Sequence, residues 1–239
     1  MGLLLSLVFL SLGGCAPAPT QRRVPENPEV ITAQASNLDW QRLPRLMGKA
    51  NVVMEVKGQV IMIEVDGDHA PLTAGNFVDL VEQGVYDGLM FHRVIRDPEP
   101  FVVQGGDPLS ADPEVDVERL GAGSYPDPQT QRPRYIPLEI QPEGWDEPIY
   151  SQTLLAANIP DPPILTHRRG AIAMARSQMP DSASAQFYFA LSDLLRLDGD
   201  YAVFGYVTAG MDIVDRIQPG DRIDSARVIS GLERLERPE

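Results

Sequence analysis

The sequence predicts a mainly β protein, folded as a closed barrel with two helical lids. Short runs of strand-forming residues recur along the chain, whereas only two segments have convincing helical spacing of apolar residues. The 22 prolines and 20 glycines among 239 residues disfavour long helices. Because 43% of the residues are apolar, the chain can bury a compact core. Many short strands with few helices are typical of a barrel.

The first two expected strands form a hairpin. Residues 51–56 and 59–65 are rich in β-forming residues, and only Lys57 and Gly58 separate them. Gly58 is free to adopt a positive φ in that turn. The Asp-Gly-Asp run at 66–68 is interpreted as the next turn, because the ligand series and closing glutamate of a calcium loop do not follow it.

Two helices and six further strands are expected downstream. A helix is predicted over residues 71–83, where Pro71 suits the first turn and apolar residues form one stripe. A second helix is predicted at 211–217. The remaining strands are expected at 89–95, 101–104, 171–175, 186–191, 202–207 and 227–230.

A proline-rich stretch interrupts this pattern. Eleven of the 22 prolines lie between Pro108 and Pro163. Proline removes a backbone donor and fixes φ, so we expect residues 108–168 to be an insertion of loop rather than core strand. A loop of this length is either functional or packed over the surface.

The N-terminus predicts export. Residues 2–12 form an apolar run too short to span a bilayer but suited to a signal peptide, and Cys15 follows two glycines. This resembles the lipobox of bacterial lipoproteins, which implies lipid modification of Cys15. The alternative is an ordinary secretory signal with an incidental cysteine. We therefore expect a signal peptide at 1–14, a flexible tether at 15–37, and a folded domain at 38–239 that begins with a short docking segment.

Charge and cysteine content exclude several classes of function. The formal net charge of −14 disfavours nucleic-acid binding, because such a surface repels phosphate. A single cysteine excludes an intramolecular disulfide framework and a multi-cysteine metal site. Motifs typical of nucleotide-binding folds, zinc proteases and serine hydrolases are missing from the sequence. This agrees with the chemistry considered below, for which we expect no metal and no cofactor.

Strand alternation predicts a pocket near Arg93. If Phe91 faces the core, Arg93 shares its face, while Phe101 and Val103 share a face opposite to Val102 and Gln104. Such strands would build an apolar pocket with a few convergent polar groups. The alternative is a surface arginine whose stem lies along apolar core residues.

Five motifs resemble the signature of cyclophilin-type peptidyl-prolyl cis-trans isomerases. They are FHRVI at 91–95, FVVQGGD at 101–107, GAIAMARS at 170–177, SAQFYF at 184–189 and LDGDYAVFG at 197–205. The similarity runs in order from about residue 52 to residue 231. It implies an eight-stranded antiparallel barrel with two capping helices and a site that acts on proline-containing polypeptides.

The resemblance also assigns roles to residues. Arg93 is similar to the family's catalytic arginine, and Gln104 to the glutamine that supports it. The other substrate-binding positions implied are His92, Phe101, Val102, Ala175, Arg176, Gln186, Tyr188, Leu197 and Tyr201. For His92, a structural hydrogen-bonding role is the favoured reading.

The chemistry implied is rotation about an X-Pro amide. Resonance places a barrier of about 20 kcal/mol between the cis and trans forms. In the twisted transition state the proline nitrogen regains a lone pair. A guanidinium that donates to this nitrogen stabilises the twisted form more than either planar one, which is what catalysis requires.

Several positions depart from the family pattern. Val102 replaces a methionine, Tyr188 a phenylalanine and Tyr201 a histidine, while Arg196 stands where many members carry an aromatic residue. A buried Tyr188 hydroxyl would need a partner. Three extra residues at 96–100 lie close to the pocket. These changes predict modest activity and put cyclosporin binding in doubt.

The insertion is most similar to that of the thylakoid-lumen branch of the family. That similarity implies photosystem II assembly components as partners. Together with the lipobox-like run that ends at Cys15, it predicts a lipid-anchored protein facing the periplasm or thylakoid lumen. Two alternatives stay open. One is a non-catalytic chaperone or assembly factor with the same fold, and the other is an acidic lipoprotein whose motif match is only structural.

Overall fold

The sheet begins with the predicted hairpin. The structure is a computed structural model that describes residues 40–238, so the predicted signal peptide, Cys15 and tether lie outside the described residues. Strands β2 (Lys49–Val56) and β3 (Gln59–Asp66) pair in continuous antiparallel register. Lys57 and Gly58 both have positive φ, 52° and 67°, as a two-residue turn that follows the strand twist requires.

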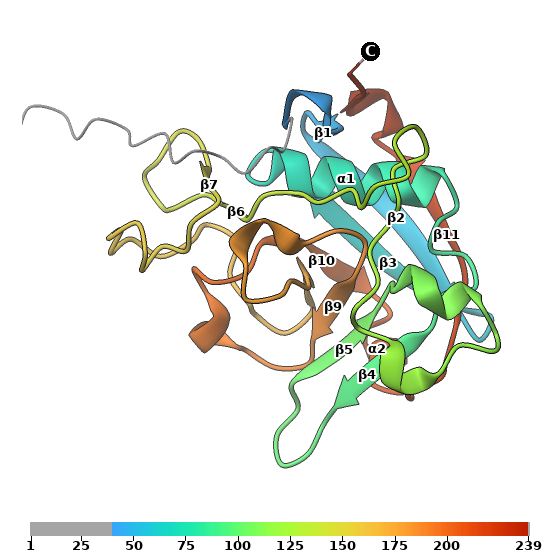
Figure 1. The fold of residues 1–239 in the computed structure, drawn as a ribbon. Helices are drawn as coiled ribbons and strands as arrows, with labels where there is room; N and C mark the ends of the chain where they lie inside the picture. Colours follow the sequence, from blue (N-terminus) through green and yellow to red (C-terminus); the bar gives the residue numbers. More distant parts are fainter. Residues whose placement is uncertain (1–39, 239) are drawn as a thin grey trace, which may run out of the picture. The chain divides into compact units, whose positions relative to one another are not determined.

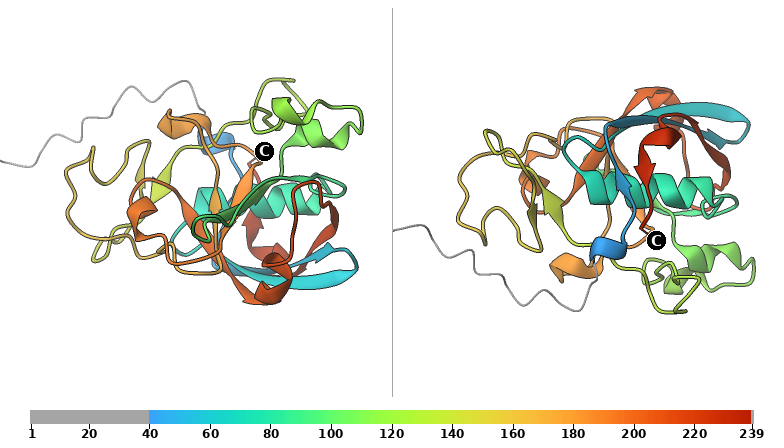
Figure 2. Two further views of the ribbon diagram at one scale, coloured as in Figure 1. Left: turned by 90° about the horizontal axis from the view of Figure 1, so that it is seen from below. Right: turned by 90° about the horizontal axis from the view of Figure 1, so that it is seen from above.

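Eight strands form one antiparallel sheet (Figures 1 and 2). The remaining six are β4 (Phe91–Ile95), β5 (Val102–Gly105), β8 (Ala171–Met174), β9 (Phe187–Ala190), β10 (Val203–Ala209) and β11 (Ile223–Ser230). Their order across the sheet is β11-β2-β3-β10-β8-β9-β5-β4. All six predicted strand segments are confirmed, and β11 starts four residues earlier than expected.

The barrel is open rather than closed, because β4 and β11 do not pair along their lengths. One isolated bridge joins Met90 to Arg222 beside these strands. Backbone hydrogen bonds from Phe91 N to Asp221 O (2.8 Å) and from Ile223 N to Leu89 O (2.9 Å) cross the same seam. The predicted closure is therefore replaced by a short bridged seam.

Two α-helices lie at opposite ends of the curved sheet (Figures 1 and 2). Helix α1 (Pro71–Glu82) matches its prediction, and ten of its residues are buried. Helix α2 (Met211–Val214) is shorter than predicted. From Arg216 onward the backbone makes i→i−3 bonds, with Arg216 N to Ile213 O at 2.9 Å, so the α-helix ends in tighter turns.

The two faces of the sheet carry separate apolar clusters. The main core contains α1 and an aromatic group that includes Phe77, Phe187 and Phe204, with the Phe77 and Phe204 ring centroids 5.0 Å apart. Neighbouring strand residues point to the opposite face and form what we call the outer cluster. It consists of Val102, Ala171, Ala173, Tyr188, Ala190, Leu194 and Val203. A small third cluster lies mainly within the insertion, where Leu138, Ile140 and Leu154 pack with Ala202.

The proline-rich insertion is packed over the surface. It contains short elements only: 3-10 helices η2 (Pro108–Ala111) and η3 (Val117–Arg119), and a small hairpin of β6 (Glu139–Ile140) and β7 (Ile149–Tyr150). The buried carboxylate of Glu139 accepts hydrogen bonds from Leu72 N (3.0 Å) and Thr73 N (2.7 Å). These two N–H groups lie in the first turn of α1, where the helix itself offers no partner. The insertion thus caps α1.

The two ends of the described chain meet beside the β2–β3 hairpin. Residues of the predicted docking segment form η1 (Trp40–Arg42) and β1 (Arg45–Leu46), and β1 pairs with β12 (Leu235–Glu236) after η6 (Leu232–Arg234). The other short helices are η4 (Pro180–Ser182) and η5 (Leu195–Leu197).

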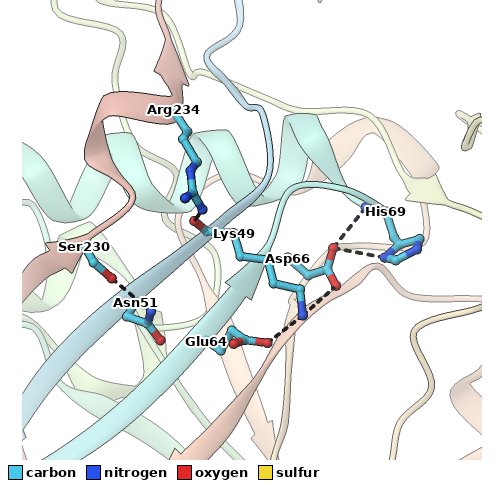
Figure 3. Close-up of polar contacts among 7 residues, drawn as sticks. All are labelled: Lys49, Asn51, Glu64, Asp66, His69, Ser230 and Arg234. Atoms are coloured by element: carbon cyan, nitrogen blue, oxygen red, sulfur yellow. Dashed lines mark hydrogen bonds and ion pairs between the residues drawn. The ribbon is translucent and has the colours of Figure 1, made fainter.

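Polar side chains tie this end of the barrel together (Figure 3). Lys49 Nζ lies 2.7 Å from Glu64 Oε1 and 3.9 Å from Asp66 Oδ2, and Arg234 Nη1 donates to Lys49 O at 2.8 Å. Asp66 Oδ1 also accepts from His69 N at 3.0 Å. The hydrogen bond to Glu64 raises the pKa of Lys49. None of these residues reaches the site described below. Within residues 40–238, no helix combines the length and apolar character needed to cross a membrane.

Candidate active site

A β-bulge turns Arg93 toward the outer face of the sheet. In the β4–β5 pairing, Phe91 lies opposite Gly105 but Arg93 lies opposite Gln104, so β4 holds one extra residue at this point. Simple alternation would have placed Arg93 on the face of Phe91, which is fully buried in the core. That prediction was wrong, because a bulge reverses the alternation. Arg93 therefore shares a row with Gln104 and Tyr188.

Phe101 also departs from the predicted alternation. It precedes β5, and its N–H donates to Ile95 O at 3.0 Å. Its ring packs against the outer cluster with Val102, whereas Val103 is buried in the main core. The predicted sharing of a face by Phe101 and Val103 was wrong, since Phe101 is outside the strand.

Nine of the predicted residues line one cavity of about 150 Å³ over the outer cluster. They are Arg93, Phe101, Val102, Gln104, Ala175, Arg176, Tyr188, Leu197 and Tyr201. Strands β4, β5 and β9 provide four of them, η5 provides Leu197, and loop residues beside β5, β8 and β10 provide the rest. Drug-sized ligands occupy pockets of about 300 Å³ or more. This cavity therefore suits a single small ring.

A chain of hydrogen bonds orients the Arg93 guanidinium. Its Nη1 donates to Gln104 Oε1 (3.1 Å), and Gln104 Nε2 donates to Gln186 Oε1 (3.1 Å). Gln186 Nε2 in turn donates to Gly123 O (2.8 Å) and to Asp107 Oδ2 (3.3 Å). Because a carboxylate only accepts, Asp107 fixes which end of each amide faces the next. Gln104 is thereby left with its oxygen toward Arg93.

A second chain lies beneath the cavity and satisfies the Tyr188 hydroxyl. Tyr188 is 5% exposed, and its hydroxyl lies 2.9 Å from His167 Nε2. The other ring nitrogen, His167 Nδ1, lies 2.8 Å from Asp198 Oδ1. Burial lowers the pKa of His167, against the opposing effect of Asp198, so the ring is neutral near pH 7. A proton on Nδ1 leaves Nε2 to accept from Tyr188.

The two arginines at the mouth stack on aromatic rings. Arg176 Cζ lies 4.7 Å from the centroid of the Tyr201 ring, and its Nη2 donates to Asp200 O at 2.7 Å. Arg196 Cζ lies 4.7 Å from the centroid of Phe101. The substitution at position 196 therefore covers the pocket phenylalanine with a planar cation instead of an aromatic side chain.

A larger cavity of about 410 Å³ adjoins the first and shares Gln104, Ala175 and Arg176 with it. Residues 121–124 of the insertion form part of its wall, together with Gln186. Asp107 Oδ2 accepts from Gly121 N (2.6 Å) and Gly123 N (3.1 Å) and so holds this wall in place. The insertion thus lines the second cavity but not the one that contains Arg93.

His92 lines neither cavity. It is half-buried beside Gly121, and burial lowers the pKa of its ring. Its structural role stays a prediction. The described residues contain no group of three or more His, Cys, Asp and Glu side chains placed to hold a metal ion.

Asp107 and His167 were not among the predicted site residues. Asp107 closes the QGGD motif, so the motif itself was a signal. The only signal for His167 was that a buried Tyr188 hydroxyl needs a hydrogen-bond partner. That requirement does not indicate where in the chain the partner lies.

The chain matches known proteins in both sequence and fold. Residues 51–233 match the family model of the cyclophilin type peptidyl-prolyl cis-trans isomerases. The chain belongs to the cyclophilin family. It is 41% identical over 207 residues to a Synechocystis protein named as a thylakoid lumen peptidyl-prolyl cis-trans isomerase, a match that covers 82% of this chain and 51% of that protein.

Two further cyclophilins extend the comparison. The chloroplastic CYP38 of Arabidopsis thaliana is 38% identical over 218 residues, which cover 84% of this chain and 47% of CYP38. The chain thus spans about half the length of these two relatives. A Cryptosporidium parvum cyclophilin solved in the presence of the dipeptide Ala-Pro shares the fold, with a TM-score of 0.55, 24% identity, and coverage of 75% of this chain and 99% of that one.

Proposed function

We propose that this chain is a peptidyl-prolyl cis-trans isomerase that assists the folding of exported or thylakoid proteins. The observation that carries the proposal is the Arg93 guanidinium, which Gln104 holds at an apolar cavity sized for one ring. The isomerase names of the two relatives support it.

In the cavity, an apolar wall binds the proline ring and one cation stabilises the twisted amide. Phe101, Val102 and Tyr188 would hold a proline ring by excluding water from it. The residue before the proline then swings while the ring stays fixed. As the amide twists, its nitrogen gains a lone pair, and an Arg93 N–H donates to it. Arginine suits this role because it stays charged and its donors are fixed in a plane.

The test is an isomerisation assay on the purified full chain. NMR exchange spectroscopy with an Ala-Pro tetrapeptide measures the cis-to-trans rate without a coupling protease. We expect acceleration above the uncatalysed rate, and we expect Arg93→Ala to remove most of it. A rate at background with folded wild-type protein would refute the proposal.

A second candidate is a non-catalytic chaperone or assembly factor. The observation that favours it is the cavity of about 410 Å³, in which the insertion supplies part of the wall, because such a cavity offers room for more chain than a proline ring needs. The two candidates separate in the Arg93→Ala variant. A chaperone keeps its suppression of client aggregation in that variant, whereas an isomerase loses its effect on proline-limited refolding.

The location proposed is a lipid-anchored protein that faces the periplasm or thylakoid lumen. The thylakoid lumen and chloroplast named for the relatives support the compartment, and the Leu-Gly-Gly-Cys run at 12–15 supports the anchor. Photosystem II assembly components are candidate partners in that compartment. Cys15→Ser should move the protein from the membrane to the aqueous fraction, and an unchanged distribution would exclude the anchor.

A further inference from the structure

The mouth of the cavity is positive in an acidic protein. The chain has 34 acidic and 20 basic residues, Lys plus Arg, and a formal net charge of −14. Yet the residues that line the two joined cavities include two arginines, Arg93 and Arg176, and no carboxylate. Arg196 adds a third guanidinium over the ring of Phe101.

Within residues 40–238, these three guanidinium groups have no carboxylate partner. Some exposed arginines elsewhere lie against acids, as Arg169 does with Asp215 at 2.6 Å and Arg227 with Asp87 at 2.7 Å. The donors of Arg176 are instead satisfied by backbone carbonyls, among them Asp200 O. Its charge is therefore held in place but not neutralised by an ion pair.

The carboxylates closest in sequence to Arg196 are engaged elsewhere. Asp198 Oδ1 is held by His167, and Asp193 Oδ1 accepts from the N–H of Arg169 at 2.8 Å. Arg196 itself is exposed. The Arg196 Cζ lies 4.7 Å from the centroid of Phe101, and a guanidinium presents donors that match a carboxylate with two parallel hydrogen bonds.

We propose that these three arginines make the site selective for proline segments that carry an acidic side chain close to the proline. The inference rests on the isomerase proposal and names the substrate class of the same site. When a proline occupies the small cavity, a substrate carboxylate within two residues of it lies near Arg196 or Arg176 and is attracted to them. A substrate lysine at the same position is repelled by the two guanidinium groups. The preference comes from the local cations, because the chain as a whole repels anions.

The test uses three peptides that differ at one position. Each peptide contains Ala-Pro. In one set the residue before this pair is Glu, Gln or Lys, and in a second set the residue after it is varied in the same way. NMR exchange gives kcat/KM against each peptide's own uncatalysed rate, and a titration of the full chain gives Kd. We expect the Glu peptide to exceed the Gln peptide by about 2-fold to 5-fold in one set at low salt, with the Lys peptide lowest. In about 0.5 M salt the ratio should shrink toward one.

Variants locate the effect. Arg196→Glu should bring the Glu-to-Gln ratio to one or below, whereas Arg132→Glu should leave it unchanged. Arg132 is an exposed arginine of the insertion outside both cavities, so it controls for the same change in net charge. Equal values for the three peptides, or a ratio that Arg196→Glu leaves intact, would overturn the inference. If no peptide is accelerated, the isomerase proposal fails, and the Kd ratios still decide the charge preference.

Discussion

At the scale of single residues, side chains that line the site are positioned by hydrogen bonds to residues outside it. Tyr188 forms part of the cavity wall, and its hydroxyl is satisfied because His167 is neutral and faces it. Asp198 holds the far side of that ring. A buried hydroxyl without a partner would cost about 1–3 kcal/mol, so the histidine makes a tyrosine tolerable where the family pattern has phenylalanine.

The neutral state of His167 predicts how stability depends on pH. Its pKa in the folded protein is lowered from the ordinary value of 6.5, with burial as the main cause. As the pH falls below about 6.5, the unfolded chain binds a proton that the folded protein resists, so the free energy of unfolding decreases. Urea unfolding between pH 7.5 and 5 should show this loss, and His167→Gln should show a smaller one.

A direct measurement of the same ring supplies the control. The His167 proton resonances followed by NMR should report a pKa below 6.5. A ring that titrates above 6.5, or parallel unfolding curves for the two proteins, would contradict the neutral histidine.

At the scale of elements, the insertion and α1 support each other. The insertion satisfies two N–H groups of the first turn of α1 through Glu139, and it adds a second tie where Arg134 lies 2.7 Å from Asp79 of α1. Buried insertion residues such as Ile136 join the main core. The insertion is thus part of the fold, and deleting it would disturb the barrel as well as any partner surface.

Glu139→Ala tests the cap on α1. Loss of both acceptor oxygens should lower the free energy of unfolding by about 1–3 kcal/mol and speed hydrogen exchange at the amides of Leu72 and Thr73. Glu143→Ala, an exposed glutamate of the same insertion, is the matched control and should change neither quantity. Equal behaviour of the two variants would show that the cap does not hold the insertion.

Sequence patterns predicted the elements whose structure is determined by residues close together in the chain. The hairpin around Gly58 and the helix that begins at Pro71 follow from strand pairing, a two-residue turn and a proline start. The bulge that turns Arg93 depends instead on the pairing register between β4 and β5. The alternation of residues within β4 alone does not predict that register. The same holds for Glu139, whose partners lie 66 and 67 residues away.

At the scale of the whole molecule, one sheet carries two apolar surfaces with different roles. Its inner face and α1 form the core, and its outer face carries the cluster beneath the cavity. The sequence motifs predicted the nine residues that meet in this cavity, and all but Leu197 of η5 lie on strands of the sheet or close to their ends. They did not predict the wall that residues 121–124 add to the neighbouring cavity, because that wall comes from the insertion.

The central claim is that Arg93 stabilises the twisted amide rather than simply binding substrate. The most direct test measures the maximal rate and the Kd separately for Arg93→Gln in the full chain, with Arg132→Gln as a control for the loss of one positive charge. Since the apolar wall stays intact, we predict that the maximal rate falls about 100-fold to 1,000-fold, the effect typical of losing one transition-state donor, while Kd changes less than about threefold. The claim would be contradicted if the maximal rate of Arg93→Gln were unchanged and a higher Kd accounted for the whole loss of catalytic efficiency.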